Sequence, residues 1–337
     1  MRAAVVTELG KPLTIQERPV PVPGKGQILV RMEACGVCHT DIHAAHGDWP
    51  AKPRPPFVPG HEGVGTIEEF GPGEFGGMQI GMRVAIPWLA SACGVCRYCV
   101  AGWETLCESQ RNTGFSVDGA YSDYAAADAR FVVPVPSDVS ALEAAPLTCA
   151  GVTTYKAVRV AGVRPAERVA VFGVGGLGHM ALQYAKIAGA FTVGVDVSHE
   201  KLQMAVELGA DSVTHATEED PVAEIKAMGG ADVAIVTTST SDSFAQAYAS
   251  LRRGGRLVCV GLPPAGQLTV PIFDTVISGK TIIGSIVGTR NDLADVFRLH
   301  SAGRTEVITT ARKLDDINDC FADVLAGRVR ARLVLEF

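Results

Sequence analysis

Four cysteines lie within one short stretch of the sequence, 93–107, in the spacing C-x2-C-x2-C-x7-C. Three thiolates at every third residue and a fourth after a small loop can close a tetrahedron around one ion, so Cys93, Cys96, Cys99 and Cys107 predict a structural zinc site. The bacterial iron–sulfur pattern fits poorly, because its fourth cysteine follows after three residues and precedes a proline. A redox-active disulfide pair is the other alternative.

A glycine-rich stretch, GVGGLG at 173–178, follows an apolar run of strand length and opens a helical pattern. In that context Gly173 permits a tight turn, Gly175 lets the backbone approach a pyrophosphate, and Gly178 lets the helix pack close to the strand. Asp196 ends the next predicted strand, 18 residues after Gly178. Its carboxylate can accept hydrogen bonds from both ribose hydroxyls and would repel a 2′-phosphate, so NAD is predicted over NADP. The alternative is a structural turn, with Asp196 as a helix N-cap.

Three further segments carry side chains that bind metals or move protons: CGVCHTDIHA at 35–44, PGHEGVG at 59–65 and TCAGVTTY at 148–155. Each combines cysteine or histidine with hydroxyl or carboxyl groups, which suits a metal with acid–base neighbours. Their spacing alone does not say whether the three segments converge.

The elements that must position these residues follow two different sequence patterns. Residues 1–150 read as short strands, such as 131–135, between turns rich in proline and glycine, which predicts a β-rich domain. After residue 150, strands such as 191–197 and 281–287 alternate with helical stretches, which predicts an α/β fold with a doubly wound parallel sheet. The last predicted strand, 331–337, fits the first domain better than the second.

Composition limits the class of protein. The chain has 337 residues, a size that suggests two domains, with 47% hydrophobic and 20% charged residues, as in globular proteins. The net charge of −6 and the lack of long basic clusters argue against nucleic-acid binding. No apolar run approaches the roughly 18 residues of a spanning helix, and the start does not resemble a signal peptide, so we expect a soluble, cytoplasmic protein. Nine cysteines, an odd number, do not suit a secreted disulfide framework.

The segments CGVCHTDIHA, PGHEGVG, the four-cysteine lobe, TCAGVTTY and GVGGLG, in this order, resemble the zinc-dependent medium-chain alcohol dehydrogenase family, most closely its tetrameric microbial branch. The resemblance covers essentially the whole chain. It implies a GroES-like catalytic domain at 1–150 and 287–337, with the structural-zinc lobe at 93–107, and a Rossmann NAD-binding domain at 151–286. The protein it implies is a homotetrameric enzyme with NAD and two zinc ions per chain, acting on a small alcohol or aldehyde, without a nucleic-acid or membrane partner.

The resemblance also implies a catalytic zinc held by Cys38, His61 and Cys149, a Cys2His set for which alcohol dehydrogenase is the standard example. Two thiolates would neutralise the ion, and a position left open would let it act as a Lewis acid on an alcohol. Asp41 would hold His61 from behind and fix its tautomer. Glu62 is implied to lie behind the zinc and to assist ligand exchange.

Proton transfer and cofactor binding are assigned by the same resemblance. Thr40 would accept the alcohol proton, and a relay through the nicotinamide ribose would pass it to His43 and solvent, while hydride moves from the alcohol carbon to the nicotinamide. The implied cofactor contacts are His39 and Arg332 at the pyrophosphate, Lys201 at the adenosine ribose, the backbones around Val260, Ser285 and Val287 at the carboxamide, and the dinucleotide motif with Gly173, Gly175, Gly176, Leu177, Gly178 and Asp196.

Trp49 and Trp88 match tryptophans that narrow the substrate pocket in the microbial branch, which favours short primary alcohols such as ethanol; plain core aromatics are the alternative.

A related polyol or aryl alcohol dehydrogenase is the second hypothesis. Cys149 argues against the polyol enzymes, which often have Glu there, and Asp196 argues against the aryl enzymes, which usually favour NADP. A non-catalytic zinc-binding interaction protein is the hypothesis from another class. Cys35, Cys259 and Cys320 have no assigned role.

Overall fold

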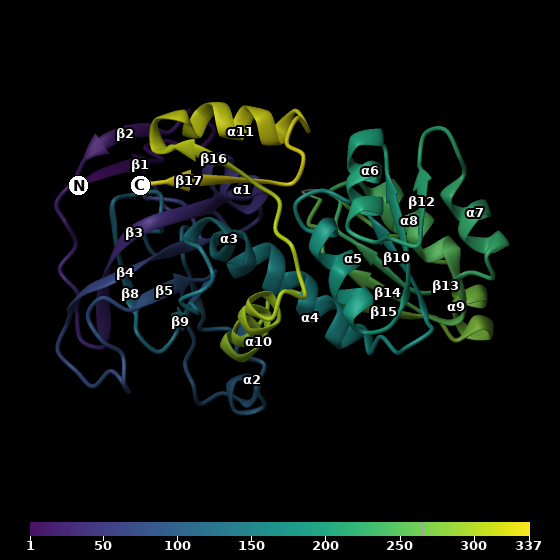
Figure 1. The fold of residues 1–337 in the computed structure, drawn as a ribbon, viewed down its shortest axis with the longest axis horizontal. Coiled ribbons are helices and arrows are strands. Elements are labelled where there is room, and N and C mark those ends of the chain that lie inside the picture. The colour runs from purple at the N-terminus through teal and green to yellow at the C-terminus, as the bar shows by residue number, and fades with distance from the viewer. Residues whose placement is uncertain (264–265) are drawn as a thin grey trace. The chain divides into compact units, whose positions relative to one another are not determined.

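The chain divides into two compact units in the computed structural model, which describes residues 1–263 and 266–337 (Figure 1). The first unit comprises Met1–Val152, Gly288–Gly303 and Val307–Phe337, and the second comprises Thr153–Val287 and Arg304–Glu306. The second unit is therefore inserted into the first. The short return at 304–306 is held by Gln183, whose amide donates to Glu306 O at 2.9 Å and accepts from Glu306 N at 2.7 Å.

The second unit is built on a parallel sheet in the order β12-β11-β10-β13-β14-β15. Its strands are β10 (Arg168–Phe172), β11 (Phe191–Asp196), β12 (Ser212–His215), β13 (Ala231–Val236), β14 (Leu251–Cys259) and β15 (Thr281–Gly284). All six residues of β13 are buried, as expected for a central strand of a parallel sheet that is covered on both faces. The strand order reverses at β10, which is the arrangement of a dinucleotide-binding doubly wound sheet.

The helix α4 (Val152–Ala161) leads into β10, and the strands are connected by α5 (Gly178–Ile187), α6 (His199–Glu207), α7 (Pro221–Ala227), α8 (Ser241–Ser250) and α9 (Ile272–Ser278). Local signals set their starts. Ser198 caps α6, its hydroxyl accepting from Lys201 N at 3.4 Å, and Asp220 caps α7 ahead of Pro221.

The first unit contains a mostly antiparallel sheet in the order β16-β17-β3-β4-β5-β9, with β8 also paired to β3. Its strands are β3 (Gln27–Val37), β4 (Gly63–Phe70), β5 (Arg83–Ile86), β8 (Tyr124–Asp128), β9 (Val133–Pro134), β16 (Thr309–Lys313) and β17 (Arg332–Glu336). The smaller pairs are β1 (Arg2–Val5) with β2 (Thr14–Glu17) and β6 (Leu89–Ser91) with β7 (Arg111–Asn112). The C-terminal strand β17 thus lies between β16 and β3.

Helical segments complete the first unit: α1 (His39–His46), α2 (Arg97–Val100), η1 (Glu104–Leu106), α3 (Ala141–Pro146), η2 (Leu147–Gly151), α10 (Arg290–Ser301), η3 (Leu314–Asp316) and α11 (Ile317–Leu325). The helix α3 starts with a capping box in which Ser140 and Glu143 satisfy each other's backbone groups. The fold class predicted from the sequence, an α/β protein with a β-rich and a doubly wound domain, is confirmed.

Two predicted strands are shorter in the structure. The strand expected at 131–135 is reduced to Val133–Pro134, which pair with Ala85 and Val84 of β5. The strand expected at 281–287 ends at Gly284. Within the described residues, no helix has both the length and the apolar character to cross a membrane.

Candidate metal centres and coenzyme site

Four potential metal donors meet inside the first unit. Cys38, His61, Glu62 and Cys149 each offer one donor atom, these atoms lie within 4.8 Å of one another, and all four residues are buried. Cys38 lies between β3 and α1, His61 and Glu62 directly precede β4, and Cys149 lies in η2. The structure therefore brings together the three segments whose convergence the spacing could not establish.

Cys149 owes its position to an irregular helix. Pro146 ends α3, and the next five residues form η2, a π-helical turn that continues into α4. A proline in this position lacks the N–H that a regular helix needs, and π-helical turns occur frequently at functional sites. The wider turn carries the Cys149 thiol at its middle.

The carboxylate of Asp41 holds the metal donors in place. It accepts from His61 Nδ1 at 2.8 Å, from Cys38 N at 3.1 Å and from Gly60 N at 3.1 Å. The hydroxyl of Tyr121 donates to the same carboxylate at 2.9 Å. With Nδ1 engaged, Nε2 is the nitrogen that His61 can offer to an ion. Sequence reasoning missed Tyr121, because no motif surrounds it and it reaches Asp41 only through the tertiary fold.

The donors influence one another's ionisation. The thiols of Cys38 and Cys149 hydrogen-bond to each other, which holds the pKa of Cys38 well below its usual range and raises the pKa of Cys149. Burial lowers the pKa of His61, but the Asp41 carboxylate outweighs it, and the net pKa is well above the ordinary value. Two cysteine sulfurs and an imidazole make a donor set of the kind that zinc prefers, and binding the ion would displace their protons.

Glu62 forms a buried ion pair with Arg332 of β17. Burial raises the pKa of Glu62 to about 7, although the guanidinium acts in the opposite direction. Its Oε2 has no hydrogen-bond partner among the described residues. The sequence assigned Arg332 to the cofactor pyrophosphate; in the structure its guanidinium binds Glu62, and the pyrophosphate contact stays a prediction. No sequence signal links two residues so far apart in the chain.

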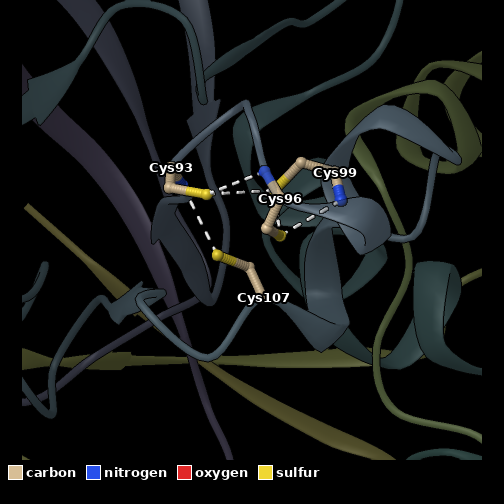
Figure 2. Close-up of side chains that lie close together, drawn as sticks. All are labelled: Cys93, Cys96, Cys99 and Cys107. Atoms are coloured by element: carbon tan, nitrogen blue, oxygen red, sulfur yellow. Dashed lines mark hydrogen bonds between the residues drawn. The ribbon is translucent and has the colours of Figure 1, made fainter.

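The four-cysteine lobe brings its sulfur atoms around a common centre (Figure 2). Cys96 Sγ lies 3.5 Å and Cys93 Sγ lies 4.0 Å from Cys99 Sγ, which brackets the separation of about 3.8 Å expected for a tetrahedron with zinc–sulfur bonds of about 2.3 Å. Backbone N–H groups of Val95 and Cys96 donate to Cys93 and lower its pKa to about 6. All nine cysteines lie in the described ranges, and none forms a disulfide there.

The glycine motif lies in the second unit, between β10 and α5. Gly173 has φ +91°, and a Cβ on Gly178 would lie 1.8 Å from Gly173 O, so both positions require glycine. Gly176 and Leu177 complete the turn, and no described side chain caps α5 at Leu177. The N–H groups of its first turn are therefore suited to a phosphate.

Asp196 ends β11 beside this turn and accepts from Val174 N at 2.7 Å. Ser198, not Asp196, is the side chain that caps α6, so the N-cap alternative for Asp196 is wrong. Lys201 Nζ lies 3.9 Å from where a Cβ on Gly175 would be, which places its charge next to the glycine turn.

Val260, Ser285 and Val287 follow the carboxyl ends of β14 and β15, at the sheet edge where such folds bind ligands. The N–H groups of Val260 and Ser285 already donate to Val236 O and Cys259 O. The buried Ser285 hydroxyl has no partner in the described part of the chain, which leaves a polar group for a ligand.

The remaining predicted residues lie on or near α1. His39 is its exposed first residue, and Thr40 and His43 are three positions apart, hence on one face. His43 Nδ1 lies 2.8 Å from Asp48 Oδ2. The His43 ring lies 5.4 Å from Trp49, centroid to centroid.

An aromatic cluster borders the metal donors. The Trp88 ring packs edge-on against His61, with ring centroids 5.3 Å apart, and edge-on against Trp49 at 6.5 Å. Phe115 contacts both tryptophans, at 6.0 Å from Trp49 and 5.8 Å from Trp88, and was missed by sequence reasoning. The two tryptophans that were singled out from the sequence therefore lie together beside a predicted zinc ligand.

Comparisons with known proteins agree with this geometry. Residues 24–137 match the family profile described as alcohol dehydrogenase GroES-like domain, and residues 176–302 match that of zinc-binding dehydrogenase. An alcohol dehydrogenase of Geobacillus stearothermophilus is 52% identical over 337 residues, which is 100% of this chain and 99% of the relative. The chain belongs to the zinc-dependent medium-chain alcohol dehydrogenase family.

Solved structures of similar proteins have the same fold. The alcohol dehydrogenase of Aeropyrum pernix matches with a TM-score of 0.93 at 35% identity, over 100% of both chains. Acetophenone reductase of Geotrichum candidum, solved in complex with NAD, matches with a TM-score of 0.89 at 30% identity, over 100% of this chain and 97% of the reductase. The prediction of an NAD-dependent, zinc-containing alcohol dehydrogenase is thereby confirmed at the level of family and enzyme class.

Proposed function

We propose that the enzyme interconverts short primary alcohols, such as ethanol, with their aldehydes, using NAD and two zinc ions per chain. The observation that carries the proposal is the buried set of Cys38, His61 and Cys149, with Trp88 packed against His61 and Trp49 against Trp88. A homotetrameric assembly and a cytoplasmic location belong to the same proposal as family expectations.

The catalytic zinc would be held by Cys38, His61 and Cys149. When bound there, zinc supplies a Lewis acid that makes an alcohol more acidic. The donors fit it: two sulfurs and one imidazole nitrogen occupy one buried site, and Asp41 fixes the imidazole with its Nδ1 engaged. Glu62 lies beside these ligands with one oxygen unpartnered among the described residues, which is consistent with a role in ligand exchange. The four-cysteine lobe would hold the second, structural zinc.

Helix α1 supplies the groups that move the proton. Thr40 presents a hydroxyl one turn from His43, and the alcohol proton passes first to that hydroxyl. Asp48 holds the His43 ring through Nδ1, which leaves Nε2 to exchange protons with solvent. The geometry of α1 thus orders the two groups along one helix face.

The second unit would bind the coenzyme, which would supply a hydride acceptor for the alcohol carbon. The uncapped start of α5 and the glycine turn would hold the pyrophosphate, with Lys201 beside them. Asp196 would accept from the ribose hydroxyls, and its charge would disfavour a 2′-phosphate. We therefore expect NAD to be preferred over NADP.

The tryptophan pair sets the size of the substrate. Trp88 lies next to His61 and Trp49 packs against Trp88, so two large rings would restrict the space that a bulky alcohol needs. A pocket that excludes by size alone discriminates by roughly 10- to 200-fold per methylene. This is the feature that favours a short-chain enzyme over an aryl or polyol relative.

The test compares kcat/KM for primary, secondary, aryl and polyol alcohols, with NAD and with NADP. For Trp49→Ala and Trp88→Ala we expect the ratio of bulky to short alcohol to rise by about tenfold or more. Phe191→Leu, at the amino end of β11, is the control and should leave that ratio unchanged. An unchanged ratio in both tryptophan variants would refute the substrate assignment. Failure of the wild type to reduce NAD with any alcohol would refute the function itself.

A further inference from the structure

A third group of metal-ligating side chains lies in the second unit, apart from both predicted zinc sites. His199, His215 and Glu218 each offer a donor atom, and these atoms lie within 4.8 Å of one another. Neither histidine lies in a motif that the sequence assigns to the zinc sites or the coenzyme site. His199 begins α6, His215 ends β12, and Glu218 lies in the turn that follows β12 (Figure 1), so two separate segments meet here.

The contacts within the group are close. His199 Nε2 lies 2.9 Å from Glu218 Oε1, and the His199 and His215 rings lie 4.2 Å apart between centroids with their planes 31° apart. Thr217 Oγ1 lies 3.2 Å from His215 Nδ1. It is a partner of the kind with which metal-bound histidines fix their tautomer.

The charges around the group favour a cation. Glu218, Glu219 and Asp220 are consecutive, and Glu219 also anchors the site by accepting from His215 N at 3.1 Å. Two protonated imidazoles at this distance would repel each other, whereas two neutral imidazoles and a carboxylate can share one divalent ion. An ordinary surface ion pair between His199 and Glu218 would not need the second ring.

We propose that His199, His215 and Glu218 form a third metal site, which binds a divalent transition-metal ion such as Zn2+, Ni2+ or Cu2+ and completes its coordination with water. Two imidazoles and a carboxylate suit these ions, whereas Ca2+ and Mg2+ prefer oxygen ligands only. The His199 side chain is 73% exposed, so the ion exchanges with solvent, unlike one enclosed by four thiolates. The site does not depend on the proposed alcohol oxidation.

The experiment uses untagged, zinc-loaded enzyme and Ni2+ as the probe. Calorimetric titration should show one Ni2+ per chain, with zinc content unchanged when it is measured afterwards. His199→Gln and Glu218→Gln should each weaken Ni2+ binding by roughly 10- to 100-fold or more. That range is found even when the mutated residue only hydrogen-bonds a metal ligand. His46→Gln, which removes an exposed histidine of α1 in the other unit, is the matched control and should bind Ni2+ like the wild type.

Three results would overturn the proposal: no Ni2+ uptake by the wild type, uptake matched by release of zinc, or equal binding by wild type and His199→Gln. Far-ultraviolet circular dichroism of each variant checks the fold, which we expect to persist because His199 and Glu218 are exposed. Cu2+ gives an independent readout, because two bound imidazoles produce nitrogen hyperfine structure in its electron paramagnetic resonance spectrum. Loss of that structure in His199→Gln but not in His46→Gln supports the site, and its absence in the wild type contradicts it.

Discussion

At the scale of single residues, the buried carboxylate of Asp41 organises the catalytic centre more than any other side chain. It binds His61, the backbone at Cys38 and Gly60, and the Tyr121 hydroxyl. Because a buried carboxylate needs such partners, its position and that of the metal donors are set together. A single metal ligand can therefore be replaced while the other hydrogen bonds of Asp41 stay in place.

Cys38→Ser should abolish turnover while the fold persists. A hydroxyl is a much poorer zinc ligand than a thiolate. Because losing a residue that only hydrogen-bonds a ligand costs about 10- to 100-fold, kcat should fall by more than about 100-fold. Zinc content should fall from two ions to one per chain. Cys320→Ala, a buried cysteine of α11, is the matched control and should keep both ions and full activity. Full activity in Cys38→Ser would contradict the catalytic-zinc assignment.

Asp196→Gly should weaken the preference for NAD. Hydrogen bonds to a charged group contribute about 1.5–3 kcal/mol, so the ratio of kcat/KM with NAD to that with NADP should fall by roughly tenfold or more. Glu224→Gln, an exposed carboxylate on α7, tests for a general charge effect and should change nothing. If both variants keep the wild-type ratio, Asp196 has no part in choosing the coenzyme.

At the scale of elements, three neighbouring strands of the first unit are joined by a polar contact. Glu33 of β3 accepts from Arg83 Nε of β5 at 3.0 Å, and from the hydroxyl of Thr66 on β4 between them. Burial raises the pKa of Glu33, but the bonds from Arg83 and Thr66 outweigh burial, and the net pKa lies below its ordinary value of 4.5. The ionised carboxylate thus stabilises the sheet.

This contact predicts a pH dependence of stability. Because the folded pKa of Glu33 is depressed, its contribution is fully present above the unfolded value near 4.5 and is lost as pH falls through the folded pKa. Urea unfolding of Glu33→Gln should therefore show a deficit of up to about 1 kcal/mol at neutral pH that shrinks on acidification below 4.5. Glu74→Gln, at an exposed position with the metal ligands equally intact, should show no such trend. A deficit in Glu33→Gln that does not vary with pH would contradict the assignment.

At the scale of the whole molecule, the sequence predicted the two-part fold because its signals are local. Strand and helix periodicity, the glycine turn and the four-cysteine spacing each depend on neighbours in the chain, and each appears in the structure. The catalytic donors are different. Cys38, His61 and Cys149 come from three separate segments, and only the family resemblance suggested that they meet.

What the sequence could not predict are contacts made across long separations. The bonds from Tyr121 to Asp41 and from Arg332 to Glu62 join residues with no shared motif. Residues 304–306 return to the second unit, where the backbone of Glu306 hydrogen-bonds to the side-chain amide of Gln183. No sequence pattern predicts this contact. Tertiary packing determines such contacts, and local propensity therefore does not predict them.

The position of β17 between β16 and β3 has a consequence for the order in which the two units can fold during synthesis. A ribosome delivers residue 153 to residue 287 as one continuous piece, so the second unit can fold while the first still lacks its C-terminal strand. Only β17, which follows the second unit in the chain, brings Arg332 to Glu62 and covers the edge of β3. We therefore expect the first unit to complete its fold after the second, because the ion pair beside its metal donors can form only once β17 has emerged.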